Sequence, residues 1–334
     1  MQKFVFCKNI FVLPIDLYIY FWYNSAYTVI VKGGYGNMGM NEFKSYHPVV
    51  NFIYFVFVIG FSCFFMHPVC LGISVVSGFT YSVLLKGTGA IKTNLVYMIP
   101  MLLITAVMNP LFNHGGVTII EYLPDGNPLT LESVIYGLCA AFMIVSVICH
   151  FSCYNEVMTS DKIIYLFGRI VPSLSLIISM TLRFVPRFVH QLKLIADVQR
   201  CMGRGVSGGS IIKRAKHGLD ILSVMTTAAL ENAIETADSM KSRGYGIHGR
   251  TSFSIFRFDS RDRKALVWLF FSGIYTFIGA FNGAMDFTYF PSVKGTELSV
   301  YGFSVFFVYL LLCISPVIIE LREVIRWKAL RSKI

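Results

Sequence analysis

The sequence predicts an all-α polytopic membrane protein with about six transmembrane helices and an inserted pair of long amphipathic cytoplasmic helices. Its composition is 55% hydrophobic and only 14% charged, whereas soluble domains carry about 25% charged residues. Several apolar runs are long enough to cross a bilayer. Between two apolar blocks lies a basic, polar stretch, residues 183–264, which is too hydrophilic to sit in lipid.

Residues 1–39 stand outside this pattern and are interpreted as an N-terminal extension. The apolar run there contains Pro14 and Asp16, and a charge at the centre of a membrane helix costs about 2.5–3.5 kcal/mol. The run also lacks the small-residue cleavage site of a secretory signal. We hypothesise that the start is mis-assigned, that the glycine pair after this run is a translated ribosome-binding site, and that translation begins at Met38 or Met40.

Six apolar runs are expected to span the membrane. They are residues 49–66, 69–85, 95–112, 131–148, 265–285 and 300–319. The apolar part of residues 170–182 is too short to cross and favours an interfacial or re-entrant helix. The expected regions are therefore a four-span bundle (40–153), the interfacial and cytoplasmic coupling helices (154–264), the last two spans (265–319) and a basic tail (320–334).

The distribution of charge predicts the orientation in the membrane. Residues 183–264 contain 15 Lys and Arg against 7 Asp and Glu, and the tail after Ile319 contains 5 against 2. Loop 113–131 has no basic residue, and loop 286–297 has only Lys294. Because Lys and Arg accumulate in cytoplasmic loops, the basic stretch and the C-terminus are expected in the cytoplasm.

Composition argues against several other classes of protein. Most Phe and Tyr residues lie in the apolar runs rather than among the basic residues, so a nucleic-acid groove is not expected. The eight cysteines form no C-x-x-C pair, so no disulfide framework is predicted. Cys149, His150 and Cys153 have no second cluster that would complete a tetrahedral metal site, and we interpret them as packing residues.

Two amphipathic helices are predicted within the basic stretch, at about 186–202 and 210–242. The first ends at Gly203-Arg204-Gly205, and the glycines Gly208 and Gly209 extend the break as a hinge. Ser210 is a plausible N-cap for the second helix, which ends at Ser242-Arg243-Gly244. In that helix Ala229, Ala233 and Ala237 recur every four residues, and such a stripe lets another helix approach closely.

An Arg-Gly pair is typical of an ordinary helix end, because Gly permits the left-handed turn and Arg favours the helix dipole. Here two pairs occur 39 residues apart, each after an amphipathic helix. An exposed guanidinium is a planar, permanently charged group that can bind a carboxylate of a partner. The repetition therefore favours a docking role for Arg204 and Arg243.

The stretch resembles the coupling region of the transmembrane (T) component of energy-coupling factor (ECF) transporters, the family that includes the cobalt-transport permease subunit. That family carries two Ala-Arg-Gly-type motifs at the ends of two cytoplasmic helices. The matching residues are Gly203, Arg204 and Gly205, then Ser242, Arg243, Gly244 and Tyr245. Gly and Ser replace Ala at the first positions. The resemblance also covers His47-Pro48, residues 179–189 and the basic tail.

The resemblance implies an energy-coupling subunit of an ABC importer for a vitamin or a metal ion, located in the plasma membrane of a bacterial cell. Its implied partners are two ABC ATPases, which bind ATP and Mg, and one small membrane subunit that binds the substrate. No catalytic residue, metal or cofactor is expected in this chain, which lacks the nucleotide-binding pattern G-x-x-x-x-G-K-[ST]. Two alternatives stay open: a permease that binds its own substrate and, with less support, a lipid-modifying membrane enzyme.

Overall fold

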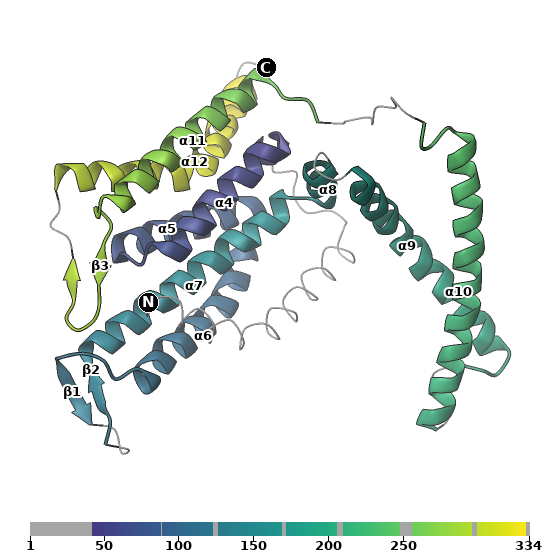
Figure 1. The fold of residues 1–334 in the computed structure, drawn as a ribbon, viewed down its shortest axis with the longest axis horizontal. Helices are drawn as coiled ribbons and strands as arrows, with labels where there is room; N and C mark the ends of the chain where they lie inside the picture. Colours follow the sequence, from purple (N-terminus) through teal and green to yellow (C-terminus); the bar gives the residue numbers. More distant parts are fainter. Residues whose placement is uncertain are drawn as a thin grey trace. The chain divides into compact units, whose positions relative to one another are not determined.

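The computed structural model describes residues 42–87, 89–122, 126–168, 172–205, 210–247, 256–295 and 299–331. Helices dominate these ranges, and the strands form two short antiparallel hairpins, β1–β2 and β3–β4 (Figure 1). The predicted all-α class is therefore confirmed. In chain order the elements are α3 (Glu42–Ser45), α4 (Pro48–Phe64), α5 (Pro68–Lys86), α6 (Gly89–Phe112), β1 (Ile119–Tyr122), β2 (Pro128–Thr130), α7 (Leu131–Val157), α8 (Ser160–Gly168), α9 (Pro172–Cys201), α10 (Ile211–Ser242), α11 (Ser260–Phe281), β3 (Phe287–Thr288), β4 (Lys294–Gly295) and α12 (Val300–Arg331). The N-terminal extension, and with it the proposed start, lies outside the described residues.

Each of the six expected apolar runs forms a helix. Among the described residues, α5, α6, α7, α11 and α12 are long and apolar enough to cross a membrane. The remaining run is α4, which is apolar but has 17 residues, close to the roughly 20 that a perpendicular span needs. The chain is therefore a multi-pass membrane protein.

Two histidines determine where α4 and α5 begin. The Nδ1 atom of His47 accepts a hydrogen bond from Val49 N at 3.3 Å, and that of His67 accepts one from Val69 N at 3.2 Å. Each ring nitrogen thus satisfies a backbone donor that has no partner within the helix. A proline follows each histidine and has no N–H to satisfy, so the His-Pro pair is a compact start signal.

Buried hydroxyl groups and close helix contacts hold the bundle together. Ser74 on α5 lies within 2.5 Å of the Ser62 hydroxyl on α4 and 2.6 Å of the Ser146 hydroxyl on α7. His150 Nε2 is 3.2 Å from the Ser74 hydroxyl, and the ring packs against Gly78. Lipid gives little hydrophobic drive for helix association, so such hydrogen bonds and small residues determine which faces meet.

The start of the first helix predicted in the basic stretch differs from the prediction. Residues 170–182 were expected to form a short interfacial helix, with a new helix starting near Pro186. Instead α9 runs without a break from Pro172 to Cys201, and Pro186 lies inside it. A proline removes one backbone hydrogen bond, yet the helix continues across it, and Phe184 and Phe188 stack on either side of the proline.

The C-terminal segment also differs from the expected boundary at residue 319. Helix α12 continues to Arg331, so the basic residues of the tail extend the last transmembrane helix. The structure therefore places the last span and most of the tail in one rod.

Candidate functional site

Helices α9 and α10 form a helical hairpin and pack against each other (Figure 1). The side chain of Arg187, near the middle of α9, donates to Asn232 Oδ1 at 3.3 Å. The face of α10 that is at least partly covered has helical spacing: Ile221, Met225, Ala228, Asn232 and Thr236. The spacing of about one residue per turn limits the contact to a narrow strip along α10.

The first Arg-Gly site lies immediately after α9. Gly203 has φ +77°, and its N–H bonds to the Arg200 carbonyl at 3.1 Å. The N–H of Arg204 bonds to the Gln199 carbonyl at 2.9 Å. These two bonds define a Schellman motif in which Gly203 is the left-handed residue and Arg204 follows it.

The second Arg-Gly site closes α10 in the same way but with a different register. Gly244 has φ +77°, and its N–H bonds to the Lys241 carbonyl at 3.0 Å. The N–H of Tyr245 bonds to the Met240 carbonyl at 3.0 Å. Gly244 is therefore the left-handed residue here, and Arg243 precedes it.

The two arginines are thus not structurally equivalent, although their sequence motifs look alike. Arg204 lies one residue beyond the left-handed glycine, and Arg243 lies one residue before it. Gly205, which the motif pairs with Gly244, is not left-handed. In the sequence the two Arg-Gly pairs look equivalent. The hydrogen bonds show that the two arginines differ by two residues in their position relative to the left-handed glycine.

Both arginine side chains are exposed. Within the described residues Arg204 forms no ion pair with an acidic side chain of this chain. The neighbourhood of Arg204 in the sequence is strongly basic. Its other cations are Arg200, Lys213, Arg214 and Lys216. Cations in the first turns of α10 oppose the helix dipole, at a cost of about 0.3–1 kcal/mol each, so their charge does not serve helix stability.

The two arginines lie far apart. Helix α10 has 32 residues and no internal proline, so it is about 48 Å long at 1.5 Å per residue. Arg204 is seven residues before Ile211, and such a segment reaches at most about 25 Å. Arg204 and Arg243 are therefore separated by more than about 20 Å, so they cannot enter the same side-chain pocket of a partner.

The other expected site residues divide into two groups. The hinge glycines Gly208 and Gly209 lie outside the described residues. In the alanine stripe, Ala229 is half-buried, whereas Ala233 and Ala237 are exposed. No described residue covers Ala233 and Ala237. That this part of the stripe packs against a helix of another subunit stays a prediction.

A junction at the start of α4 fastens α8, the helix that precedes α9. Lys162 donates to the backbone carbonyl of Lys44, and Lys44 forms an ion pair with Glu156 at 3.5 Å. His47 Nε2 lies 3.2 Å from the Tyr165 hydroxyl. Burial, with the nearby charge of Lys44, lowers the pKa of Lys162 to about 8.

Contacts between aromatic rings also hold the junction together. Tyr165 contacts Phe256, and His47 contacts Phe258, both just before α11. Sequence reasoning missed these residues; the only available signal was a lysine and a tyrosine among apolar residues in 160–168. The junction connects the hairpin to three segments of the bundle.

Comparison with known proteins identifies the family. Residues 40–253 match the model of the CbiQ family, which is described as cobalt transport protein. The chain belongs to the CbiQ family. The predicted resemblance is thereby confirmed, and the match includes the whole α9–α10 hairpin with both Arg-Gly sites.

The chain is also similar to individual proteins named energy-coupling factor transporter transmembrane protein. The chain is 36% identical over 99 residues to the energy-coupling factor transporter transmembrane protein EcfT of Lactobacillus helveticus (strain DPC 4571), covering 29% of this chain and 36% of that protein. It is 24% identical over 193 residues to the protein of the same name from Staphylococcus aureus (strain 04-02981), covering 54% and 71%. A further relative, EcfT 1 of Listeria monocytogenes serotype 1/2a (strain 08-5578), is 28% identical over 171 residues, covering 47% and 63%. The alignments thus span from about a third to about two thirds of these relatives.

Proposed function

We propose that this chain is the energy-coupling transmembrane subunit of an ECF-type importer. In this role it links two ATPase subunits to a small membrane subunit that binds the substrate, a vitamin or a metal ion. The names of the relatives, energy-coupling factor transporter transmembrane protein, support the proposal. ATP and Mg would be bound by the ATPases, and this chain would have no catalytic part.

One observation carries the proposal: two exposed arginines end the two helices of one hairpin, more than about 20 Å apart. A single side-chain pocket of a partner cannot receive both. A pair of related ATPases offers two grooves, and a guanidinium forms strong hydrogen bonds with a carboxylate in each. A change in the separation of the two grooves would then act on both ends of the hairpin.

The junction at α8 supplies the connection between the hairpin and the membrane. Since Lys162 and Tyr165 bond to the segment that starts α4, a displacement of α9 is passed to the bundle. The excess of Lys and Arg in residues 183–264 supports a cytoplasmic position for the hairpin. The substrate-binding subunit would contact the apolar residues that α9 and α10 leave exposed.

The test is co-purification of an affinity-tagged form of this chain with its ATPases after expression of the whole complex. The double variant Arg204→Glu with Arg243→Glu is expected to insert into the membrane but to lose the ATPases, since two attractive contacts become repulsive. The matched control is Arg200→Glu with Lys241→Glu, which makes the same charge change in the last turns of the same helices. The control is expected to retain them.

Normal co-purification of the double variant contradicts the docking role. Equal loss in the control means that overall charge, rather than the two arginine positions, determines binding. Substrate binding by this chain without a further membrane subunit would instead favour a permease that recognises its own substrate.

A further inference from the structure

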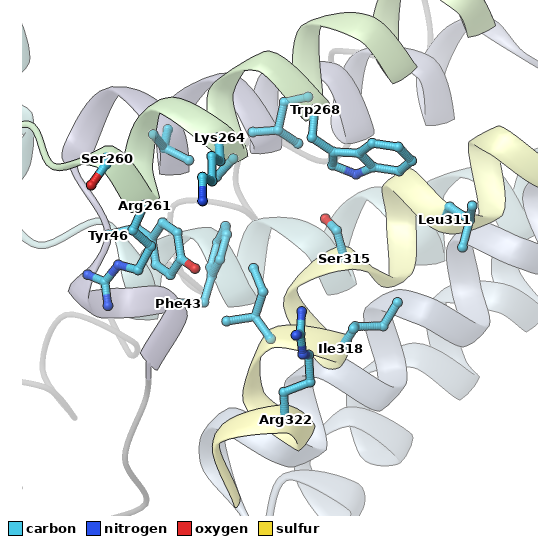
Figure 2. A pocket seen from close by; sticks show the side chains of 14 residues that line it. Phe43, Tyr46, Ser260, Arg261, Lys264, Trp268, Leu311, Ser315, Ile318 and Arg322 are labelled. Carbon is cyan, nitrogen blue, oxygen red and sulfur yellow. The ribbon is translucent and has the colours of Figure 1, made fainter. Parts of the chain in front are cut away.

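A pocket at the charged ends of α11 and α12 lies apart from both Arg-Gly sites. It has a volume of about 610 Å³, within the range of small-molecule sites. Three segments line it: α11, α12 and the start of the bundle at α3 and α4 (Figure 2). On α11 the lining residues include Lys264 and Trp268, one turn apart, and on α12 they include Leu311 and Arg322.

One end of the pocket carries uncompensated positive charge. Lys264 and Arg322 extend toward the middle from opposite walls (Figure 2). Neither forms an ion pair with an acidic residue among those that the structure describes. The third cation, Arg261, is already engaged: it pairs with Glu42 and lies 4.4 Å from the centre of the Tyr46 ring.

The acidic residues close to the pocket are also occupied. Glu320 accepts hydrogen bonds from the backbone N–H groups of Glu42 at 3.2 Å and Phe43 at 3.1 Å. Asp262 is buried and accepts from His47 N at 3.1 Å. An ammonium and a guanidinium therefore face the same space without an ion-pair partner among the described residues, an arrangement that suits a phosphate.

The other end of the pocket is apolar. Along α12 the residues that line the pocket extend from Arg322 to Leu311, a distance of 11 residues or about 16 Å. Leu269 and Val50 continue this apolar wall from α11 and α4. A ligand that fills the pocket must therefore join an anionic head to an apolar tail.

The surface around the pocket favours lipid over an aqueous partner. Beside Trp268, Val267 is 61% and Phe271 is 64% exposed, and Phe307 on α12 is 59% exposed. Such apolar side chains on a transmembrane helix face the hydrocarbon. Trp268 is one helical turn from Lys264, and tryptophan near a helix-end cation is typical of the membrane interface.

We propose that this pocket binds an anionic phospholipid, with its phosphate between Lys264 and Arg322 and an acyl chain along the apolar wall toward Leu311. Basic pockets between transmembrane helices bind such head groups. The bound lipid would join α11 to α12 and to the start of α4. The proposal does not depend on the ATPase-docking role of Arg204 and Arg243.

Native mass spectrometry of the purified full-length chain tests the proposal, with phosphatidylglycerol and phosphatidylcholine as the two probes. The wild type is expected to prefer phosphatidylglycerol by about 25-fold, because each interfacial cation contributes about fivefold. Lys264→Gln with Arg322→Gln is expected to remove the preference. The control Arg263→Gln with Arg326→Gln, which removes two exposed charges outside the pocket on the same helices, is expected to keep it.

Thermal unfolding of each variant without added lipid checks that all of them fold. An unchanged preference in Lys264→Gln with Arg322→Gln overturns the proposal, as does an equal loss in the control. Glycerol phosphate distinguishes the two sources of phosphate. If it displaces phosphatidylglycerol at equal concentration, the site takes free phosphate and the lipid proposal fails; weak competition supports the acyl-chain contact.

Discussion

The transmembrane bundle and the α9–α10 hairpin are both helical, but they are held together differently. In the bundle, buried hydroxyls bond across three helices around Ser74, and glycines bring backbones close. In the hairpin, one narrow strip of contact joins the helices, and large apolar side chains such as Leu230 (62%) and Ile234 (65%) stay exposed. The bundle therefore specifies its own packing, whereas the contact between α9 and α10 covers only a small part of their apolar surface.

The largest expected effect concerns the junction between the two regions. The pKa of Lys162 is lowered from 10.5 to about 8 by its burial. Below pH 8 both the folded and the unfolded chain carry the proton, so the folded state bears the full cost of the buried charge. Between pH 8 and 10.5 the folded state loses the proton first, and stability rises with pH.

The rise amounts to at most about 3 kcal/mol at 1.36 kcal/mol per pKa unit. Equilibrium unfolding in mixed micelles, followed from pH 7.5 to 10.5, measures it as the difference between wild type and Lys162→Met. The variant is expected to lack this component of the slope, because it has no ionisable group at position 162. Identical slopes would show that Lys162 is solvated and that the junction is loose.

The second expected effect separates bundle packing from hairpin packing with one substitution. A Cβ atom added at Gly279 on α11 would lie 2.5 Å from Val305 Cγ1. Val305 is fully buried and β-branched, so it cannot turn away. Gly279→Ala is therefore expected to destabilise the bundle by about 1–3 kcal/mol, the usual cost of overpacking.

Gly218 on α10 is the matched position in the hairpin. A Cβ atom there meets nothing within 4 Å, and alanine favours a helix over glycine by about 1 kcal/mol. Gly218→Ala is expected to raise the thermal midpoint that Gly279→Ala lowers. Changes of the thermal midpoint in opposite directions would confirm the contrast between the two regions. A lower midpoint in both variants would show that α10 is packed as tightly as the bundle.

The smallest expected effect distinguishes the two Arg-Gly sites. Gly244→Ala places a side chain on a left-handed residue, at a cost of about 1 kcal/mol to the end of α10. Gly205→Ala is expected to leave the end of α9 intact, because Gly205 is not left-handed. Gly203→Ala should instead resemble Gly244→Ala.

Hydrogen exchange at the last turn of each helix measures these three variants. Faster exchange in Gly205→Ala, equal to that in Gly244→Ala, would mean that the two sites share one register after all. If exchange stays slow in Gly203→Ala, then Gly203 is not the left-handed residue that ends α9.

The sequence was sufficient to predict whatever depends on neighbouring residues. Apolar runs predicted the six bundle helices, and glycines predicted the ends of α9 and α10. The continuity of α9 through Pro186 was missed, because a proline usually ends a helix. The extension of α12 to Arg331 was missed because the polar composition changes at residue 319 while the helix does not.

The features of the candidate site that were missed depend on contacts between distant segments. Lys162 meets Lys44, 118 residues away, and no periodicity reports such a contact. The pocket requires Lys264 and Arg322 on two helices to face the same space. The Arg-Gly motifs were predicted, but their register depends on which glycine adopts the left-handed conformation at the helix end. Each motif has more than one glycine nearby, so the sequence alone does not identify it.

The shift of two residues between the Arg-Gly sites has a consequence for symmetry. A pair of identical partner subunits related by a twofold axis would present two identical recesses, yet this chain offers them two differently mounted guanidinium groups. One follows a reversal of the backbone and the other precedes it. Under the proposed docking role, the two guanidinium groups would approach such recesses from backbones of different register, so the two contacts would not be equivalent by symmetry.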